Sequence, residues 1–315
     1  MLKNVIAWSG FLLIAVMQQP VLAEECENWH SRHPAWIFCD DFESVEALVN
    51  NKRYFEHDSN DSEFVPIENV GFNNSRGMRV LWQAGETGAG NLKLAFGRNP
   101  SSYMDKGIRN TEDFREIYYR MYLKMQSGWQ GNPFKLSRAS VISADDWSQA
   151  MIAHLWQGTT NELAIDPVSC VGQDNNVECV AYNDFDHMDY LGFKNGQTQL
   201  FAGGADNRWY CIEAHVKLND AGQSNGIQEF WIDGQLEVSS DNLNFVGSYN
   251  DYGINTVFFE NYWNGGSPAE QQRYFDNIVV STQPIGCLSG VQPVADDRLC
   301  FAVMTSQAKP ATVCL

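Results

Sequence analysis

The sequence predicts an all-β fold in which two antiparallel sheets form a sandwich, and three observations carry this prediction. Residues 209–218 alternate between apolar and polar side chains, and residues 116–125 (EIYYRMYLKM) do the same. A period of two is typical of a strand with one buried face. The third observation is a hairpin signal, because residues 226–232 are rich in β-formers and lead through Asp233-Gly234 into another strand-like segment.

The other strands are expected from shorter apolar or aromatic segments that end in turn residues. In chain order these segments are 36–44, 71–82, 91–96, 150–157, 254–263 and 274–281. Three stretches are not predicted to be strands. Residues 45–65 and 130–140 are expected to be irregular, and residues 159–190 are interpreted as a long insertion of the kind that lines a binding face.

The N-terminus predicts export from the cytoplasm. An apolar run follows Lys3, and small residues precede position 24, as in a cleaved signal peptide. We therefore interpret residues 1–23 as a signal peptide, 24–286 as the sandwich and 287–315 as a disulfide-tied tail of a secreted or periplasmic protein. No later apolar segment is long enough to span a bilayer, so membrane insertion is not expected.

The chain contains eight cysteines, and an even number in an exported protein favours disulfides. Eight cysteines allow about 105 pairings, so the sequence alone does not determine the connectivity. Pairing sequence neighbours is the simplest assignment, and it leaves one long-range pair. The four expected bonds are Cys26–Cys39, Cys170–Cys179, Cys300–Cys314 and Cys211–Cys287. A zinc site is disfavoured because the chain has no Cys-x-x-Cys motif.

The chain is strongly acidic, with a formal net charge of −18 at pH 7. Such a surface repels nucleic acid and anionic membranes, so neither is an expected partner. The same charge argues against a polyanionic substrate unless a local basic groove overrides it. We expect a monomer that binds a polysaccharide or oligosaccharide.

Oxygen-bearing side chains at both ends of the predicted sandwich suggest a structural Ca²⁺ site. Asp40, Asp41 and Glu43 form an acidic corner at the end of the first strand, and the turn Asn73-Asn74-Ser75 offers carbonyl oxygens to the same cation. Asp276 lies among β-branched and aromatic residues, where an unpaired carboxylate is costly and needs a partner. The alternative interpretation of the acidic corner is a solvated turn.

The polar face of residues 116–125 is a candidate sugar-binding surface. Tyr118 and Tyr122 flank Arg120, and aromatic rings stack on sugars while a guanidinium donates to hydroxyls or a carboxylate. The alternative is an ordinary solvated sheet face with cross-strand pairs. Lys135, in the segment expected to be a loop, is a further candidate for binding substrate.

His154 and Trp156 lie two residues apart in the strand 150–157, and therefore on the same face. A single histidine in a strand is more often a hydrogen-bonded structural residue than a catalyst. The neighbouring tryptophan favours a functional interpretation, so both alternatives stay open.

Five segments in chain order resemble secreted concanavalin A-like jelly-roll proteins. They are CDDFES, EIYYRMYLKM, WYCIEAHVKLN, NGIQEFWIDG and FDNIVVS, and they fall within residues 36–285. The chain is similar to the group of glucuronan lyases and the fungal cellulose-induced protein, with heparin- and alginate-lyase-like domains as wider kin. The resemblance implies a concanavalin A-like jelly roll and a Ca²⁺ held by Glu43, the Asn73–Ser75 turn and Asp276.

The resemblance also implies an active site on the concave sheet, at the strands that carry Arg120, His154 and Tyr262. In a lyase, Arg120 with Gln157 or Asn261 would neutralise a uronate carboxylate. His154 or Tyr262 would remove the C5 proton, and Tyr262 would protonate the leaving oxygen. The residues expected to bind the glycan are Tyr118, Tyr122, Lys135, Trp156, Gln157 and Asn261.

Two functions from different classes are therefore expected. The first is a polysaccharide lyase that cleaves a uronic-acid-containing glycan by β-elimination. The second is a non-catalytic carbohydrate-binding or cell-surface module with the same fold. Jelly-roll glucanase chemistry is disfavoured because the chain lacks a Glu-x-Asp-x-x-Glu run.

Overall fold

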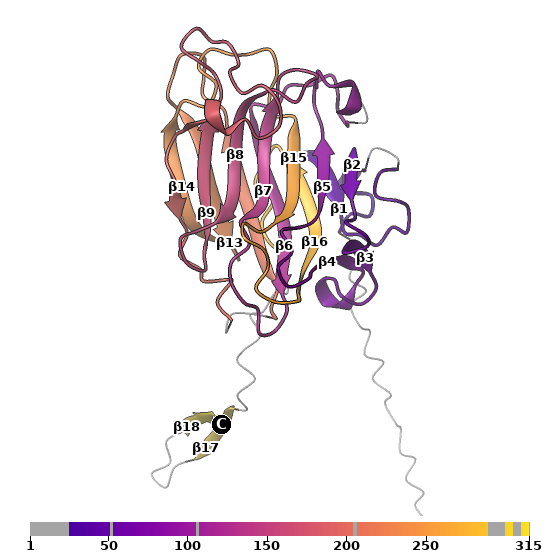
Figure 1. The fold of residues 1–315 in the computed structure, drawn as a ribbon. Helices are drawn as coiled ribbons and strands as arrows, with labels where there is room; N and C mark the ends of the chain where they lie inside the picture. Colours follow the sequence, from indigo (N-terminus) through magenta and orange to yellow (C-terminus); the bar gives the residue numbers. More distant parts are fainter. Residues whose placement is uncertain are drawn as a thin grey trace, which may run out of the picture.

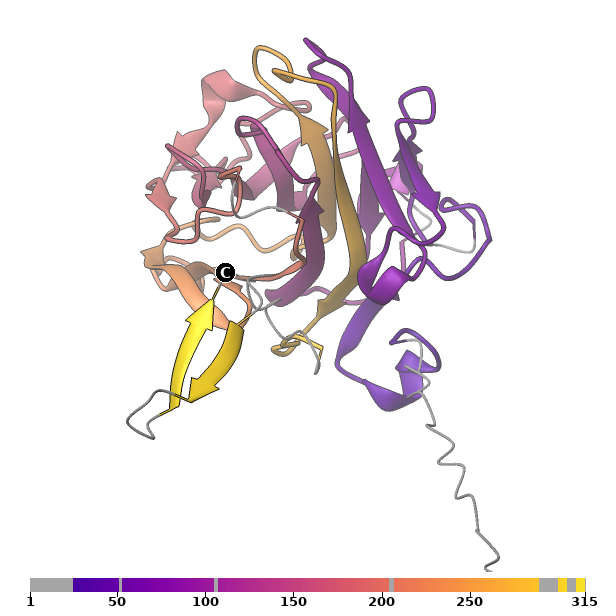
Figure 2. The same cartoon turned by 90° about the horizontal axis from the view of Figure 1, so that it is seen from below.

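The predicted sandwich of two antiparallel sheets is confirmed (Figure 1 and Figure 2). The computed structural model describes residues 25–50, 53–104, 107–203 and 207–288, together with the backbone of two strands at 300–304 and 310–314. The predicted signal peptide lies outside the described residues. In the described part of the chain, no helix is long and apolar enough to cross a membrane.

We call the first layer sheet A. Its strands follow the order β14-β13-β12-β6-β16-β4-β3, and β1 pairs with β16. The bounds are β1 Trp36–Asp40, β3 Phe64–Ile67, β4 Gly77–Trp82, β6 Glu116–Met125, β12 Tyr210–Lys217, β13 Gly226–Ile232, β14 Gln235–Leu243 and β16 Gln271–Ser281. Pairing of β1 with β16 brings the first and last strands of the sandwich side by side.

The second layer, sheet B, lies in front of sheet A in Figure 1 and has the order β10-β9-β8-β7-β15-β5-β2, with β11 paired to β9. The bounds are β2 Glu56–Asp58, β5 Gly88–Ala95, β7 Lys135–Ile142, β8 Gln149–Gln157, β9 Leu163–Ser169, β10 Asp189–Tyr190, β11 Lys194–Asn195 and β15 Thr256–Tyr262. A separate hairpin joins β17 Cys300–Met304 to β18 Pro310–Cys314.

Helical structure in the described residues is limited to single turns. These are α1 Trp29–Arg32 and the 3₁₀ turns η1 Phe72–Asn74, η2 Ser102–Met104 and η3 Phe185–His187. The turn η1 matters most here, because it lies beside the carboxylate of Asp276 on β16.

The core lies between the two sheets and follows from the alternation of each strand. On β6 the residues that face sheet B are all fully buried: Ile117, Tyr119, Met121, Leu123 and Met125. On sheet B, Leu155, Val257 and Phe259 join the same cluster. The opposite faces of both sheets therefore point away from the core, and this decides where each polar side chain lies.

Strands β6 and β13 have the predicted bounds and β12 is one residue shorter than predicted at each end, whereas three segments differ in kind from the expectation. Residues 130–140 were expected to be a loop, yet most of them belong to β7 at the centre of sheet B. The predicted insertion 159–190 contains β9 and β10, and the irregular stretch 45–65 contains β2. The prediction for β7 was wrong because a bulge breaks its alternation, as described below.

Three predicted disulfides are confirmed: Cys26–Cys39, Cys170–Cys179 and Cys211–Cys287. The side chains of the fourth predicted pair lie outside the described residues. The backbone register of the hairpin β17–β18 places position 300 opposite position 314.

Candidate functional site

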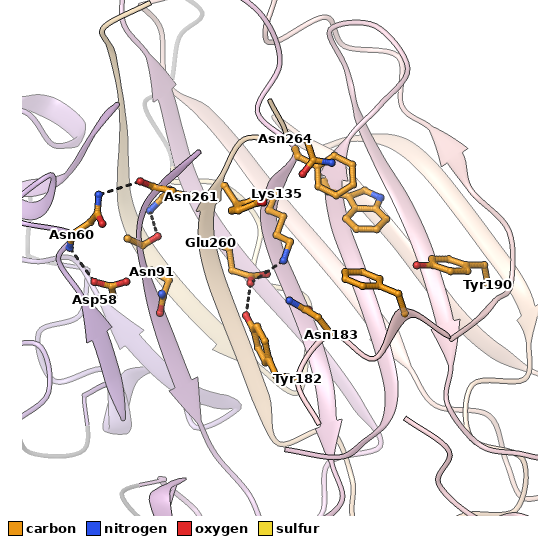
Figure 3. Close-up of a pocket in the computed structure, with 16 residues that line it drawn as sticks. Asp58, Asn60, Asn91, Lys135, Tyr182, Asn183, Tyr190, Glu260, Asn261 and Asn264 are labelled. Carbon is orange, nitrogen blue, oxygen red and sulfur yellow. Dashed lines mark hydrogen bonds and ion pairs between the residues drawn. The ribbon is translucent and has the colours of Figure 1, made fainter. Parts of the chain in front are cut away.

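A pocket of about 670 Å³ opens on the face of sheet B that points away from sheet A (Figure 3). Lys135, Trp156, Glu260 and Tyr262 line it from three neighbouring strands, β7, β8 and β15. The lining continues to Asp58 on β2 at one edge of the sheet. On the other side it continues into the 170–190 loop, which contributes Tyr182, Asn183 and Phe185, and to Tyr190 on β10.

A bulge in β7 places Lys135 in this pocket. Leu136 and Ser137 both point into the space between the sheets, since Leu136 belongs to the core and the Ser137 hydroxyl lies 3.2 Å from the Tyr119 hydroxyl. The register of β7 against β8 shifts at this point, between Lys135 and Ser137. Strict alternation back from the outward-facing Arg138 would have turned Lys135 toward the core, so the extra residue reverses its direction.

Glu260 forms the electrostatic centre of the pocket. Its Oε1 accepts a hydrogen bond from the Tyr182 hydroxyl at 2.7 Å and lies 3.1 Å from Nη2 of Arg138. Nζ of Lys135 lies 3.7 Å from the same oxygen. Figure 3 shows Lys135 and Tyr182 reaching Glu260 from opposite sides. Two basic side chains thus face the Glu260 carboxylate, while a second carboxylate, Asp58, lies at the edge of the same pocket.

The pKa of Glu260 follows from this arrangement. Burial raises it, but Arg138 and Lys135 outweigh burial and hold the pKa at about 2. Burial also lowers the pKa of Lys135, an effect that Glu260 opposes and that Arg138 and Lys93 reinforce. A lowered pKa increases the fraction of the neutral amine, which is the form that a general base requires.

Tyr262 completes the reactive edge of the pocket. Its side chain is 40% exposed, and Nζ of Lys135 lies 5.3 Å from the centre of its ring. An amine and a phenol therefore lie side by side at the pocket mouth, and both can transfer protons.

His154 lies beneath the pocket lining. Its ring is buried, stacks on the Trp156 ring with 4.1 Å between centroids, and has Nδ1 at 3.1 Å from the backbone oxygen of Asp166. Burial and, to a lesser degree, Arg138 lower the pKa of His154 to about 3, so the ring is neutral. These contacts favour the structural alternative for His154, whereas Trp156 does line the pocket.

The prediction that Arg120 shares a groove with His154 and Tyr262 is wrong. Strand β6 belongs to sheet A, and Arg120 lies on the face of that sheet directed away from sheet B. Its guanidinium is 1% exposed, forms an ion pair with Glu25 and donates to the backbone oxygen of Gly286 at 3.1 Å. The alternation of β6 predicted its two faces but contained no information on which sheet the strand joins.

The two tyrosines beside Arg120 also lie on sheet A, so the predicted tyrosine–arginine surface is not part of the pocket. Tyr122 is fully buried, and its hydroxyl accepts a hydrogen bond from the amide of Leu288 at 2.7 Å. Tyr118 stacks on His215 with 4.1 Å between ring centres. The segment 284–288 lies over this face and covers much of it.

Two predicted amide side chains have different positions. Asn261 lines the pocket, but its side-chain atoms are engaged: Nδ2 donates to Gly90 at 3.1 Å, and Oδ1 accepts from Arg273 at 2.7 Å. Gln157 ends β8 outside the lining residues, and its backbone amide donates to Phe134.

Sequence reasoning missed Arg138, Glu260 and Tyr182. Arg138 was predictable in principle, because the residues around it are compatible with a β-strand. The bulge between Lys135 and Ser137 interrupts their alternation, so the segment was interpreted as a loop. Glu260 and Tyr182 lie 78 residues apart and meet only in the folded chain, at 2.7 Å.

The predicted Ca²⁺ ligands meet at the turn that follows η1. Asp276 accepts hydrogen bonds from the Phe72 amide at 2.6 Å and the Ser75 hydroxyl at 3.1 Å, and Glu43 accepts from the Arg76 amide at 2.9 Å. Asn74 belongs to the same turn. Asp276 is fully buried, and burial raises its pKa well above the ordinary value.

The side chains at this corner are oxygen donors, but among the described residues no group of three or more His, Cys, Asp or Glu side chains is placed to hold a metal ion. No basic side chain in the described ranges forms an ion pair with Asp276, and its carboxylate lies beside the Ser75 hydroxyl. Oxygen donors of this kind are the ligands that Ca²⁺ prefers.

The comparisons with known proteins point in one direction. The family described as Polysaccharide lyase 14 matches residues 172–278, from the loop beside the pocket to β16. An endo-beta-1,4-glucuronan lyase from the fungus Trichoderma reesei is similar in structure, with a TM-score of 0.52 and 15% sequence identity. That likeness covers 79% of this chain and 96% of the other, and at this identity it concerns the fold.

Two alginate lyases are also similar, each with 12% identity and a TM-score of 0.49. The match to the marine PL-14 alginate lyase from Aplysia kurodai covers 79% of this chain and 99% of that enzyme. The match to the alginate lyase from Chlorella virus covers 82% of this chain and 97% of that enzyme. None of the curated proteins matches in sequence. The resemblance to jelly-roll polysaccharide lyases inferred from the sequence is confirmed, and the fold is the jelly roll of that class.

Proposed function

We propose that the protein is a secreted polysaccharide lyase that cleaves a uronic-acid-containing glycan by β-elimination in the pocket of sheet B. The observation that carries this proposal is the placement of Lys135 and Tyr262 side by side in the pocket, with Nζ of Lys135 5.3 Å from the centre of the Tyr262 ring, next to the Arg138–Glu260 ion pair. An amine and a phenol placed together can supply the base and the acid of a β-elimination. The family match at residues 172–278 supports the same reaction class.

Arg138, Lys135 and Tyr262 have different roles in the proposed reaction. The positive charge of Arg138 stabilises the negative charge that develops on the uronate in the transition state. Lys135, as the free amine, removes the proton from C5, and the C5 electron pair forms the C4–C5 double bond. The C4–O bond breaks, and the Tyr262 hydroxyl protonates the departing oxygen. Proton exchange with water then restores both groups.

The test is the ultraviolet absorbance of unsaturated uronates across a panel of polyuronates. Lys135→Met and Tyr262→Phe should each lower kcat by at least about 100-fold, since each removes a proton-transfer group. Tyr118→Phe is the matched control, because it removes a tyrosine hydroxyl on the opposite sheet. A Tyr262→Phe variant with the activity of the wild type would refute the assigned role.

The second candidate is a non-catalytic carbohydrate-binding module. It is favoured by the burial of His154 and by the structural ion pair of Arg120. This alternative predicts no absorbance change with any polyuronate, together with calorimetric binding of an oligosaccharide that Lys135→Met abolishes.

We also propose that Ca²⁺ binds at the corner formed by Glu43, Ser75 and Asp276. The ion would be structural, because the corner joins the segment after β1 to β16 and lies on sheet A rather than at the pocket. Three disulfides support the further proposal that the protein works outside the cytoplasm, in keeping with the predicted signal peptide.

A further inference from the structure

Arg273 is a buried cation without a counter-ion. It lies on β16 of sheet A, is fully buried, and points into the core, where its guanidinium lies 4.9 Å from the centre of the Trp82 ring. Among the described residues no carboxylate forms an ion pair with it, and its Nε and Nη1 atoms have no hydrogen-bond partner. Burial alone lowers the pKa of Arg273 to about 9.

The remaining nitrogen, Nη2, reaches across the core to sheet B. It donates to the backbone oxygen of Glu260 at 2.9 Å, to Oδ1 of Asn261 at 2.7 Å and, more weakly, to the backbone oxygen of Lys135 at 3.4 Å. All three acceptors lie on the core side of the strand ends that carry the pocket residues.

These acceptors coincide with irregular strand pairing. The register of β15 against β7 shifts between Phe259 and Tyr262, and its register against β5 shifts between Glu260 and Tyr262. A bulge interrupts the ladder and leaves backbone groups that need another partner. Nη2 of Arg273 supplies a partner for the Glu260 carbonyl within the bulge.

An unpaired buried charge destabilises a protein, and apolar residues of similar volume are often better tolerated at such positions. Arg273 is therefore a poor choice for stability alone. We propose that Arg273 is a positioning residue: it holds the bulged ends of β7 and β15 so that Lys135 and Tyr262 face the pocket. This inference rests on the proposed function, and it adds a residue of sheet A to those that organise the pocket on sheet B.

The experiment compares Arg273→Met and Arg273→Lys with the wild-type full chain. We expect kcat of Arg273→Met to fall about 100-fold, as for displaced catalytic groups, while its melting temperature stays above that of the Leu123→Ala control, because removal of the buried charge offsets the loss of the Nη2 donor. Arg273→Lys should recover part of the activity, because an ammonium group can still donate to the Glu260 carbonyl. Leu123→Ala is the control, since it leaves a cavity in the core on β6 and should lower the melting temperature without lowering kcat.

Hydrogen exchange supplies a readout that needs no activity. In Arg273→Met, the amides of 135–137 and 260–262 should exchange faster, while those of β12 should not change. The proposal is overturned if this variant keeps the exchange pattern of the wild type, or if its melting temperature falls and exchange rises throughout the chain. If the wild type cleaves no polyuronate, the proposed reaction fails by itself, and local exchange still decides the role of Arg273.

Discussion

Removal of calcium should loosen the corner at which the chain's first and last strands meet. Asp276 is fully buried and is bonded to the Phe72 amide and the Ser75 hydroxyl, with no ion pair to a basic side chain in the described ranges. In the proposed site a bound Ca²⁺ would compensate this carboxylate in the folded state, and the unfolded chain would offer no such site. Chelation should then lower the free energy of unfolding.

The expected size of the effect follows from mass action. Extracellular Ca²⁺ modules bind with dissociation constants down to about 10⁻⁴ M, so 10 mM Ca²⁺ is roughly a 100-fold excess. Such an excess stabilises the folded state by about 2.7 kcal/mol. For a domain of this size, the melting temperature should rise by roughly 5 °C between chelator and 10 mM Ca²⁺.

The assay is thermal unfolding with and without Ca²⁺, for the wild type and for Asp276→Asn. The variant keeps the shape of the side chain and removes its charge, so its melting temperature should not respond to Ca²⁺. Asp58→Asn is a suitable control, because Asp58 lies on β2 at the edge of sheet B and its variant should respond as the wild type does. A wild-type protein whose melting temperature is the same in chelator and in 10 mM Ca²⁺ would refute the reasoning.

Two further outcomes are expected from thermal unfolding. Replacing Cys211 and Cys287 by alanine should lower the free energy of unfolding by about 4.5 kcal/mol, because their disulfide closes a loop of 76 residues. The same replacement of Cys170 and Cys179 should lower it by only about 2.6 kcal/mol, because that loop spans 9 residues. Equal losses would contradict the loop-entropy argument. Burial lowers the pKa of His154 from 6.5 to about 3 in the folded protein. The neutral ring therefore contributes its full stabilisation above pH 6.5, and this contribution is lost as the pH falls toward 3. The melting temperature of His154→Phe should therefore fall less steeply with acidification, and an unchanged slope would count against a buried neutral ring.

Regular alternation made part of the fold predictable. Strands β6 and β13 have the bounds expected from the sequence, because every second residue of β6 is core and the turn at Asp233-Gly234 ends β13. Strand β7 was missed for the opposite reason. Leu136 and Ser137 face the same way, and a bulge of this kind removes the periodicity on which the prediction depends.

The candidate site was predictable only in fragments. Lys135, Trp156, Asn261 and Tyr262 were expected to contact the glycan or its reacting atoms, and all four line the pocket. Arg120 was placed in the wrong layer, because alternation describes the two faces of a strand but not its neighbours. A partner for Asp276 was expected because an unpaired buried carboxylate is costly, whereas Glu43 was chosen from the family resemblance; both carboxylates accept hydrogen bonds from residues 72–76, and the Ca²⁺ itself stays a prediction.

The lining of the pocket begins at Asp58 on β2 and ends at Tyr190 on β10, which are the opposite edges of sheet B. Neighbouring strands lie about 4.8 Å apart, so these six steps cover roughly 29 Å. A trough of that length accepts several consecutive sugars at once. A glycan bound as proposed would lie across the trough and extend beyond it in both directions. Cleavage would then fall in the interior of the polymer, and the viscosity of a long-chain substrate would drop early in the reaction.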